Sequence, residues 1–406
     1  MKKFRLVTLL GIRPDIIRMH KLIRLLDEGQ KKHNFEHIFV HSGQHFDYEL
    51  DEIFYQELGV RKPDVNLNIG KILKKRGKTS QAHQSALLFE KVDELMKKLK
   101  PDAVMYLGDT NTVTSALLVA KNNIPVIHIE GGGRSYDWRM PEEKNRILID
   151  HLSDAIYCYL NRYKKILLAE GIESFRIKVV GNIIADAIEE FGKIADKRKI
   201  LEKLDVKEKN FILVTLHREE NTSDKEILKN KLLALLKFGR DYKLPVIFPL
   251  MPRTKTALKK FNLSSVLNNS IFIKTEPLGF LDFLKLEKTA CLAVSDSGTV
   301  QEETLILGTP CVVARRSTER PETIWAGATI LEGFEDKGTL YKAMKRALNM
   351  KTNWDRNVLN PQGSSPSQRV YEDLIKKIKE GFFDKSRSFK KLRNNLFVRG
   401  AYGELT

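Results

Sequence analysis

The chain has 406 residues, of which 42% are hydrophobic and 30% charged, a globular composition with enough residues for two or three domains. Its 70 Lys and Arg outnumber 52 Asp and Glu, which gives a formal net charge of +18. That excess fits a nucleic acid, an anionic membrane surface or an acidic small substrate as partner, and does not choose among them. Apolar runs fall far short of the ~20 residues of a membrane-spanning helix. The three cysteines lack metal-site spacing, so we expect a cytoplasmic protein with reduced thiols.

The first half of the chain alternates short β-branched runs with longer segments of helical periodicity. The predicted strands are Phe4–Leu10, His37–Val40, Ala103–Leu107 and Val126–Ile129, and the predicted helices are Pro14–Glu28, Ser80–Leu99 and Thr112–Lys121. Strands that alternate with helices in this way form a parallel sheet covered on both faces.

The same alternation begins again after residue 182. The predicted strands are Phe211–Thr215, Val246–Leu250, Ile271–Lys274, Cys291–Ser295 and Cys311–Ala314, with helices at Asp224–Phe238 (ended by Gly239), Phe280–Glu287 and Val300–Gly308. We therefore predict an α/β fold of two Rossmann-like domains, residues 1–185 and 186–375, with a ligand cleft between them. A last predicted helix, Ser367–Lys379, is placed to cross back to the first domain, and residues 376–406 form a basic tail.

Ligands of open α/β sheets bind at the carboxyl ends of the strands, so the residues that follow each strand are candidates for a site. Arg13 follows the first strand, where it is placed to pair with a phosphate or to form a structural salt bridge. His45 follows the second predicted strand. Two roles are open for its side chain, a ligand contact and a turn cap, and the turn cap is favoured. The dinucleotide fingerprint and the Walker phosphate loop do not occur, so neither kind of site is supported.

Three carboxylates occur at successive strand or helix ends of the first domain. Asp109 follows one strand, Glu130 follows the next just before three glycines and Arg134, and Glu142 opens a helix. Each has an ordinary explanation alone, because Asp109 is placed to cap a helix and acids in a first turn stabilise the helix dipole. Together they predict one crowded site where carboxylates raise one another's pKa, as acid–base chemistry requires.

The second half offers groups suited to a nucleotide. His217 ends a buried strand and is followed by Arg218. A histidine in this position suits acid–base chemistry, contact with a phosphate or a structural role. Ser297, Gly298 and Thr299 open a helix whose free N–H groups can hold a diphosphate, and an acid one turn later can meet ribose hydroxyls. Arg320 lies in a polar cluster after the last predicted strand, where it can balance the charge of a ligand or of a carboxylate.

The chain resembles the non-hydrolysing UDP-N-acetylglucosamine 2-epimerase family in an ordered series of segments, which are GIRPDIIR, SGQH, LGDTNT, HIEGGGR, PEEKNR, VGN, LHREEN, SDSGTVQEE and STERPE. The resemblance runs from about residue 5 to about residue 375. It implies the architecture of glycogen-phosphorylase-type (GT-B) glycosyltransferases, with the ligand between two Rossmann-like domains. It also implies a homodimer and a role in the synthesis of surface polysaccharides.

The reaction that the resemblance implies is reversible inversion at C2 of a UDP-linked 2-acetamido sugar, without NAD or a required metal. UDP leaves and adds back through a glycal intermediate. The implied catalytic residues are Asp109, Glu130, Glu142 and His217, and Glu303 is the implied ribose contact. The residues implied to bind UDP or the sugar are Arg13, His45, Arg134, Asn182, Arg218, Ser297, Gly298, Thr299, Glu303 and Arg320.

Several segments depart from the usual family pattern. Gly131-Gly132-Gly133 replaces the common AGL, which leads us to expect a wider sugar end and puts a second, activating UDP-sugar site in doubt. HREEN, SDSGT and STERPE look closer to the branch that acts on 6-deoxy UDP-sugars, such as the step forming UDP-N-acetyl-L-fucosamine, which is one alternative substrate class. A hydrolysing epimerase and a GT-B glycosyltransferase are further alternatives. RNA binding is the weakest, because the basic residues are dispersed and an aromatic RNA-reading motif is missing.

Overall fold

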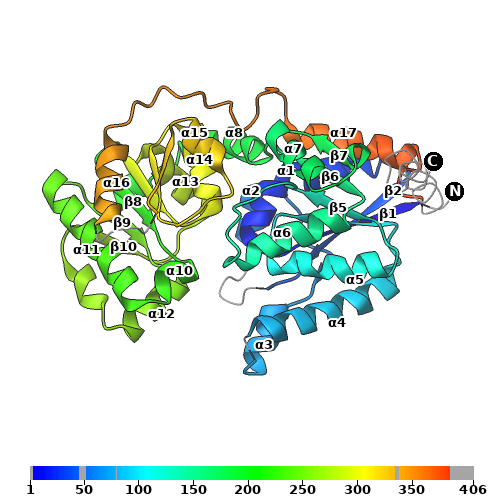
Figure 1. Ribbon diagram of the computed structural model, residues 1–406, viewed down its shortest axis with the longest axis horizontal. Helices are drawn as coiled ribbons and strands as arrows, with labels where there is room; N and C mark the ends of the chain where they lie inside the picture. The colour runs from blue at the N-terminus through cyan, green and yellow to red at the C-terminus, as the bar shows by residue number, and fades with distance from the viewer. Residues whose placement is uncertain (1–2, 45–51, 79, 334–337, 385–406) are drawn as a thin grey trace, which may run out of the picture. The chain divides into compact units, whose positions relative to one another are not determined.

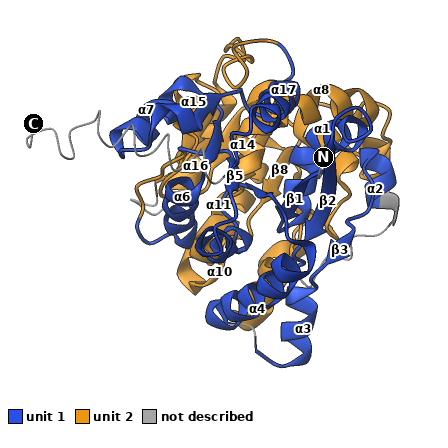
Figure 2. Cartoon of the chain, turned by 90° about the vertical axis from the view of Figure 1, so that its right-hand side faces the viewer, with its two compact units in different colours: residues 1–132, 138–183, 364–406 blue, residues 133–137, 184–363 orange. Residues whose placement is uncertain are grey.

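The computed structural model describes residues 3–44, 52–78, 80–333 and 338–384, and the chain divides into two compact units (Figures 1 and 2). Unit 1 comprises Met1–Gly132, Trp138–Ile183 and Ser364–Thr406, and unit 2 comprises Gly133–Asp137 and Ile184–Gly363. Helix α17 (Pro366–Lys379) belongs to unit 1, where it packs against α1 (Arg13–Gly29). The domain limits at residues 185 and 375 that the sequence suggests stay predictions.

Unit 1 is built on a parallel sheet with seven strands in its described part, in the order β3-β2-β1-β4-β5-β6-β7. Its strands are β1 Phe4–Leu10, β2 Phe35–His41, β3 Val65–Asn66, β4 Ala103–Leu107, β5 Val126–Ile129, β6 Ala155–Cys158 and β7 Ile177–Val179. Besides α1 and α17, its helices are α2 Glu52–Leu58, α3 Ile69–Lys75, α4 Gln81–Leu99, α5 Ala116–Lys121, α6 Pro141–Leu152 and α7 Asn161–Ala169, with 3₁₀ turns η1 Asn111–Ser115 and η2 Ser174–Arg176.

Unit 2 is built on a second parallel sheet, which has six strands within its described ranges, in the order β10-β9-β8-β11-β12-β13. Its strands are β8 Ile212–Thr215, β9 Val246–Pro249, β10 Phe272–Thr275, β11 Leu292–Ser295, β12 Cys311–Val313 and β13 Thr329–Leu331. Its helices are α8 Ile184–Ala195, α9 Ile200–Lys203, α10 Glu219–Thr222, α11 Lys225–Tyr242, α12 Pro252–Lys260, α13 Phe280–Thr289, α14 Gly298–Leu307, α15 Pro321–Trp325 and α16 Thr339–Leu348, with the 3₁₀ turn η3 Ser264–Asn268.

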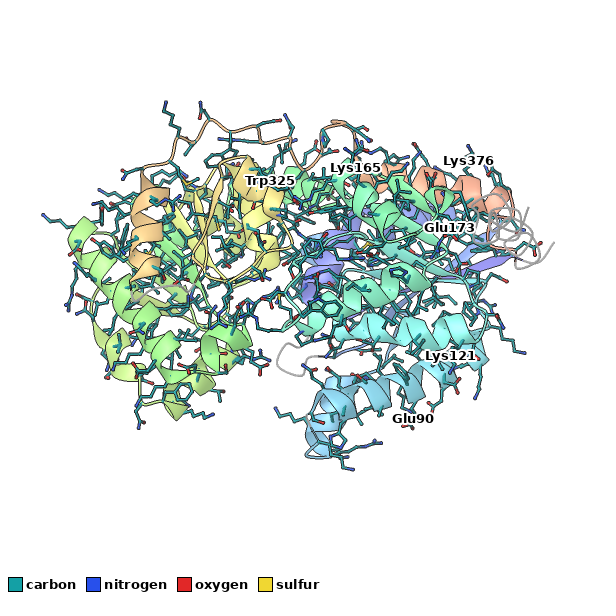
Figure 3. All side chains as sticks on the ribbon, viewed as in Figure 1. Glu90, Lys121, Lys165, Glu173, Trp325 and Lys376 are labelled. Carbon is teal, nitrogen blue, oxygen red and sulfur yellow. The ribbon has the colours of Figure 1, made fainter. Side chains whose placement is uncertain are left out.

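Both faces of each sheet are buried, which explains why the central strands are almost continuously apolar. Along β8, Ile212 and Val214 pack into one core with residues of α11, whereas Leu213 between them packs into another with Leu286 of α13. Each such side chain contributes about 1.5–3 kcal/mol when it is fully buried. Charged side chains such as Glu90 on α4 and Lys121 at the end of α5 lie on the outside (Figure 3). No helix in the described ranges is both long and apolar enough to cross a membrane.

The predicted α/β class is confirmed, and β1, β4 and β5 have the predicted bounds. Strands β3, β6, β7 and β13, which have two to four residues each, were not predicted from the sequence. The prediction that Gly239 ends a helix was wrong, because α11 continues to Tyr242. Gly239 lies inside the helix, where an added Cβ would come within 2.5 Å of Ile271 Cγ2, so its role is close packing.

Gly131 provides a test of how tightly unit 1 is packed beside its sheet. A Cβ at this position would lie 2.1 Å from Cγ2 of Ile156 on β6 and 2.8 Å from Oδ1 of Asp150. We expect Gly131→Ala to lower the free energy of unfolding by about 1–3 kcal/mol, as overpacking does. Gly192→Ala in α8 is the matched control, because an added Cβ there meets nothing within 4 Å. Chemical denaturation of both variants measures the effect, and equal stabilities would contradict the packing described here.

Candidate active site

The carboxyl edge of the unit 1 sheet gathers polar residues from strands that are distant in sequence. Because β1, β4, β5 and β6 are adjacent and parallel, the segments that follow them meet at one edge. An added Cβ on Gly11, after β1, would lie 2.5 Å from the Thr112 hydroxyl, after β4. Likewise a Cβ on Gly108 would lie 3.5 Å from Oε2 of Glu130, after β5. Two of the predicted carboxylates, Asp109 and Glu130, therefore follow neighbouring strands of one cluster.

Glu130 is buried and held by two side chains from other elements. Its Oε2 forms an ion pair with Arg18 of α1 and accepts a hydrogen bond from the Tyr159 hydroxyl at 3.3 Å. Nη2 of Arg18 in turn donates to the Tyr159 oxygen at 2.7 Å. The backbone of Glu130 has φ = +80°, in the left-handed region that non-glycine residues rarely adopt.

Asp109 is partly exposed and is held by α6. Its Oδ2 accepts from Nε of Arg146 at 2.9 Å and pairs with Nη2 of the same guanidinium at 2.7 Å. Nη1 of Arg146 donates to Glu143 at 2.5 Å, so one buried arginine joins two acids. Asn145 donates to the backbone carbonyl of Asp109 at 2.9 Å. The motif PEEKNR thus positions Asp109 through residues that the sequence analysis did not single out.

The two glutamates that open α6 differ in their surroundings. Glu142, the one predicted from the sequence, is half-buried, whereas Glu143 is 1% exposed and paired with Arg146. Glu143 therefore has a structural partner, and the catalytic assignment of Glu142 stays a prediction.

A buried histidine fixes the loop that carries Glu130. Nδ1 of His128 lies 2.8 Å from Oδ1 of Asp150, and its Nε2 lies 2.9 Å from the carbonyl oxygen of Gly108. The other oxygen of Asp150 accepts from the Gly132 N–H at 3.0 Å. The ends of β4 and β5 are thereby tied together.

The glycines after Glu130 serve close packing. A Cβ on Gly132 would lie 2.6 Å from the carbonyl oxygen of Tyr163, and one on Gly131 would overlap Ile156. The space beside both glycines is thus filled by unit 1 itself, so the expectation that they widen the sugar end is wrong for these two positions.

Asp15 is a further acid at this edge that the sequence analysis did not list as a candidate. Its Oδ2 accepts from the N–H groups of Gly11 at 3.1 Å and Ile12 at 3.2 Å. Burial raises its pKa to about 7, against the opposing effects of Arg18 and the two N–H groups, and Asp109 adds to the rise. This edge therefore carries a carboxyl group that changes protonation near neutral pH. In the sequence, Asp15 is an acid in the first turn of a helix, and ordinary helix-capping residues have the same position.

The predicted phosphate contact Arg13 opens α1. Its guanidinium lies 4.3 Å from the centre of the Phe54 ring in α2, a cation–π contact. His45, in the next predicted segment, lies outside the described residues. Asn182 is buried in unit 1 just after β7.

In unit 2, His217 lies at the carboxyl end of β8 beside the buried Asp296. Its Nδ1 is 3.1 Å from Oδ1 of Asp296, and the N–H groups of His217 and Arg218 donate to Oδ2 at 2.8 and 2.9 Å. Asn221 donates to the same oxygen at 2.8 Å. Burial alone would raise the pKa of Asp296, but His217, Asn221 and the Arg218 N–H hold it well below its usual range. Asp296 thus orients His217, a role that the sequence analysis missed.

The predicted diphosphate-binding segment is the first turn of α14, after β11. Ser297 is the residue before the helix, and its hydroxyl lies 3.2 Å from that of Thr299. A Cβ on Gly298 would come within 2.9 Å of Oε1 of Glu319. The other oxygen of Glu319, Oε2, pairs with Nη2 of Arg315 at 2.9 Å. The first N–H groups of a helix lack partners in the helix itself, so this turn can receive an anion.

Two predicted arginines have partners in unit 2. Arg320 is buried, and its Nε lies 2.6 Å from Oε1 of Glu302 in α14, so it balances the charge of a carboxylate. Nη1 of the buried Arg134 donates to the carbonyl oxygen of Gly133 at 2.7 Å. In the described ranges, no three His, Cys, Asp or Glu side chains are grouped so as to hold a metal ion.

Glu303, the predicted ribose contact, lies beside a second buried carboxyl, that of Glu287 in α13. Burial raises the pKa of Glu287 well above its usual value, and the neighbouring charge and hydrogen bond of Glu303 raise it further. Two carboxylates cannot lie together in a buried site unless they share a proton. Burial and the neighbouring Glu303 thus favour the protonated form of Glu287.

Glu287→Gln should make stability less dependent on pH. The unfolded chain releases the Glu287 proton near its ordinary pKa while the folded chain retains it, so wild-type stability falls as pH rises above that value. We expect the variant to be about 1–3 kcal/mol more stable than wild type at pH 8, with the gap closing towards pH 4.5. Denaturation at several pH values measures the difference. For the exposed control Glu226→Gln we expect a difference in stability from wild type that does not change with pH. The same constant difference for Glu287→Gln would contradict the shared proton.

The fold is of the GT-B kind, since a trehalose 6-phosphate synthase structure from Burkholderia multivorans matches it with a TM-score of 0.55 at 8% identity, over 96% of this chain and 100% of that one. The family model of UDP-N-acetylglucosamine 2-epimerase matches residues 27–372. The chain belongs to the UDP-N-acetylglucosamine 2-epimerase family.

Similar proteins and structures support this membership. The UDP-N-acetylglucosamine 2-epimerase of Methanocaldococcus jannaschii is 42% identical over 89% of this chain and 96% of its own. The crystal structure of that organism's enzyme with UDP-GlcNAc and UDP matches with a TM-score of 0.82 at 40% identity, over 91% and 99% of the two chains. The UDP-2,3-diacetamido-2,3-dideoxy-D-glucuronate 2-epimerase of Pseudomonas aeruginosa is 34% identical over 92% of this chain and 99% of its own.

Proposed function

We propose that the protein interconverts UDP-N-acetylglucosamine and UDP-N-acetylmannosamine by inverting C2 of the sugar. The observation that carries the proposal is the identity of 42%, over 89% of the chain, to a relative named for this activity. The carboxylates at the unit 1 edge and the helix start in unit 2 are the groups that such a reaction needs.

The proposed reaction proceeds by elimination and re-addition of UDP. A carboxylate takes the C2 proton while the C1–O bond to UDP breaks, which leaves a glycal with a double bond from C1 to C2. UDP then re-forms the C1–O bond as a proton is delivered to C2 on the opposite face. Because the C2 proton has no adjacent carbonyl, the departing diphosphate supplies much of the driving force, and the sequence of steps balances without a redox cofactor.

Asp109, Glu130 and Glu142 are the proposed proton-transfer groups, with His217 as the catalytic histidine. Two features support Asp109 and Glu130, since each is fixed by an arginine and each follows a neighbouring strand of one sheet. Fixing a base before the substrate arrives avoids the cost of orienting it during the reaction.

UDP is proposed to bind at the first turn of α14, with the ribose hydroxyls on Glu303. The free N–H groups of the turn and the hydroxyls of Ser297 and Thr299 suit a diphosphate, and holding UDP lets it add back rather than escape. The other residues that we assign to UDP or sugar binding are Arg13, His45, Arg134, Asn182, Arg218, Gly298 and Arg320.

A 6-deoxy UDP-HexNAc is a second candidate substrate. The segments HREEN, SDSGT and STERPE together favour it. We also propose a homodimer in the cytoplasm, to be checked by light scattering and by cell fractionation.

Proton NMR of UDP-GlcNAc with the protein in D₂O tests the proposed function. We expect deuterium at C2 of an intact UDP-sugar, together with signals of the 2-epimer. Free sugar with UDP would instead indicate a hydrolysing epimerase, and turnover only with an added acceptor would indicate a glycosyltransferase. Faster exchange with a 6-deoxy UDP-HexNAc than with UDP-GlcNAc would favour the second substrate.

Substitution of the proposed catalytic residues should reduce turnover without unfolding the protein. We expect Asp109→Asn, Glu130→Gln and His217→Ala each to lower kcat more than roughly tenfold, as the loss of a general acid or base does. Glu90→Gln on the exposed face of α4 is the control and should leave kcat unchanged (Figure 3). Rates near wild type in all three variants would remove the catalytic assignment.

A further inference from the structure

The backbone at Glu130 is held in a conformation that its side chain does not favour. With φ = +80°, the residue adopts a conformation that costs roughly 1–3 kcal/mol for a non-glycine residue. Two hydrogen bonds hold it there, because the N–H groups of Glu130 and Gly131 both donate to the carbonyl oxygen of Tyr157, at 2.9 and 3.2 Å. The end of β6 therefore fixes the direction in which the Glu130 side chain leaves the backbone.

The segment after β6 also contacts the carboxylate itself. Tyr159, two residues beyond the Tyr157 carbonyl, is 1% exposed, and its oxygen lies 3.3 Å from Oε2 of Glu130. The same oxygen accepts from Arg18 Nη2 at 2.7 Å. Since a guanidinium only donates, the phenol hydrogen in this triangle is directed at the carboxylate.

The ion pair with Arg18 already balances the charge of Glu130. A phenol adds no charge to this triangle, so the contribution of its hydrogen bond is to fix the carboxylate and to favour its ionised form. From this geometry we propose that Tyr159 is a positioning residue for Glu130, which it holds in one orientation together with Arg18. The inference rests on the proposed function, in which Glu130 moves the proton at C2.

Other titratable groups belong to the same edge of the unit 1 sheet. They are Asp15 on the same helix as Arg18, Asp109 after β4, and the His128–Asp150 pair that ties the Glu130 loop. All of them are present in wild type and in a Tyr159 variant. A difference between the two pH profiles therefore reports the loss of the phenol.

Tyr159→Phe tests the proposal, because it removes only the hydroxyl. We expect kcat to fall roughly tenfold while KM stays within about twofold, since Tyr159 is 1% exposed and is proposed to act through Glu130. In the plot of kcat against pH, the acid limb should move to higher pH by about half a unit to one unit. The reason is that the Glu130 carboxylate loses a hydrogen bond that favours its charged form.

Tyr106→Phe is the matched control. Tyr106 is also fully buried in unit 1, and its hydroxyl lies 3.1 Å from the Ser115 hydroxyl rather than from a carboxylate. We expect it to lower the melting temperature without moving the pH profile. The proposal would be overturned if Tyr159→Phe had the kcat and pH profile of wild type. It would also be overturned if Tyr106→Phe had the same altered pH profile as Tyr159→Phe.

A second variant covers the case in which Tyr159→Phe does not fold. Incorporation of 3-fluorotyrosine at position 159 keeps the hydroxyl and makes it a stronger donor, so the acid limb should move to lower pH. An unmoved limb in this variant would also overturn the proposal. If wild-type protein shows no deuterium exchange at C2, the proposed function fails instead, whatever the Tyr159 variants do.

Discussion

The placement of buried carboxylates beside donors is the constraint on which the candidate site depends. An ionised carboxyl removed from water is costly unless a cation or several N–H groups replace its hydration. Glu130 meets this requirement through Arg18 and Tyr159, and Asp109 through Arg146. Each partner comes from a different element of unit 1, so the sheet must assemble before any of these acids acquires its surroundings.

Unit 2 meets the same requirement with a different set of donors. Asp296 relies on backbone N–H groups and an amide together with His217, and Arg320 is paired with Glu302. Glu287 and Glu303 are the exception. The rise in the pKa of Glu287 is offset by neither an arginine nor a lysine, so a bound proton neutralises this carboxyl instead. Both units thus hold their carboxylates with cations and with backbone N–H groups, and unit 2 adds the protonated form of Glu287.

The sequence predicts the general plan well because hydrophobic periodicity and strand-end motifs are local signals. The alternation of strands and helices identified both sheets, and Asp109, Glu130 and His217 were proposed because each lies within two residues of the end of a strand. The residues that position them were not found. Arg18 and Tyr159 are 141 positions apart in the chain, and each alone has the appearance of an ordinary helix or strand residue. Only the order of the strands, which periodicity does not determine, brings them to one carboxylate.

The left-handed backbone at Glu130 has a consequence for how this position tolerates change. Glycine is the residue that would adopt φ = +80° without penalty, yet glycine has no group that can accept a proton. Glycine would also remove the carboxylate that pairs with the buried Arg18, a loss of about 3–5 kcal/mol that exceeds the roughly 1–3 kcal/mol of backbone strain. A thermostabilising design guided by backbone preference alone would therefore choose glycine at this position and lower the stability of the fold.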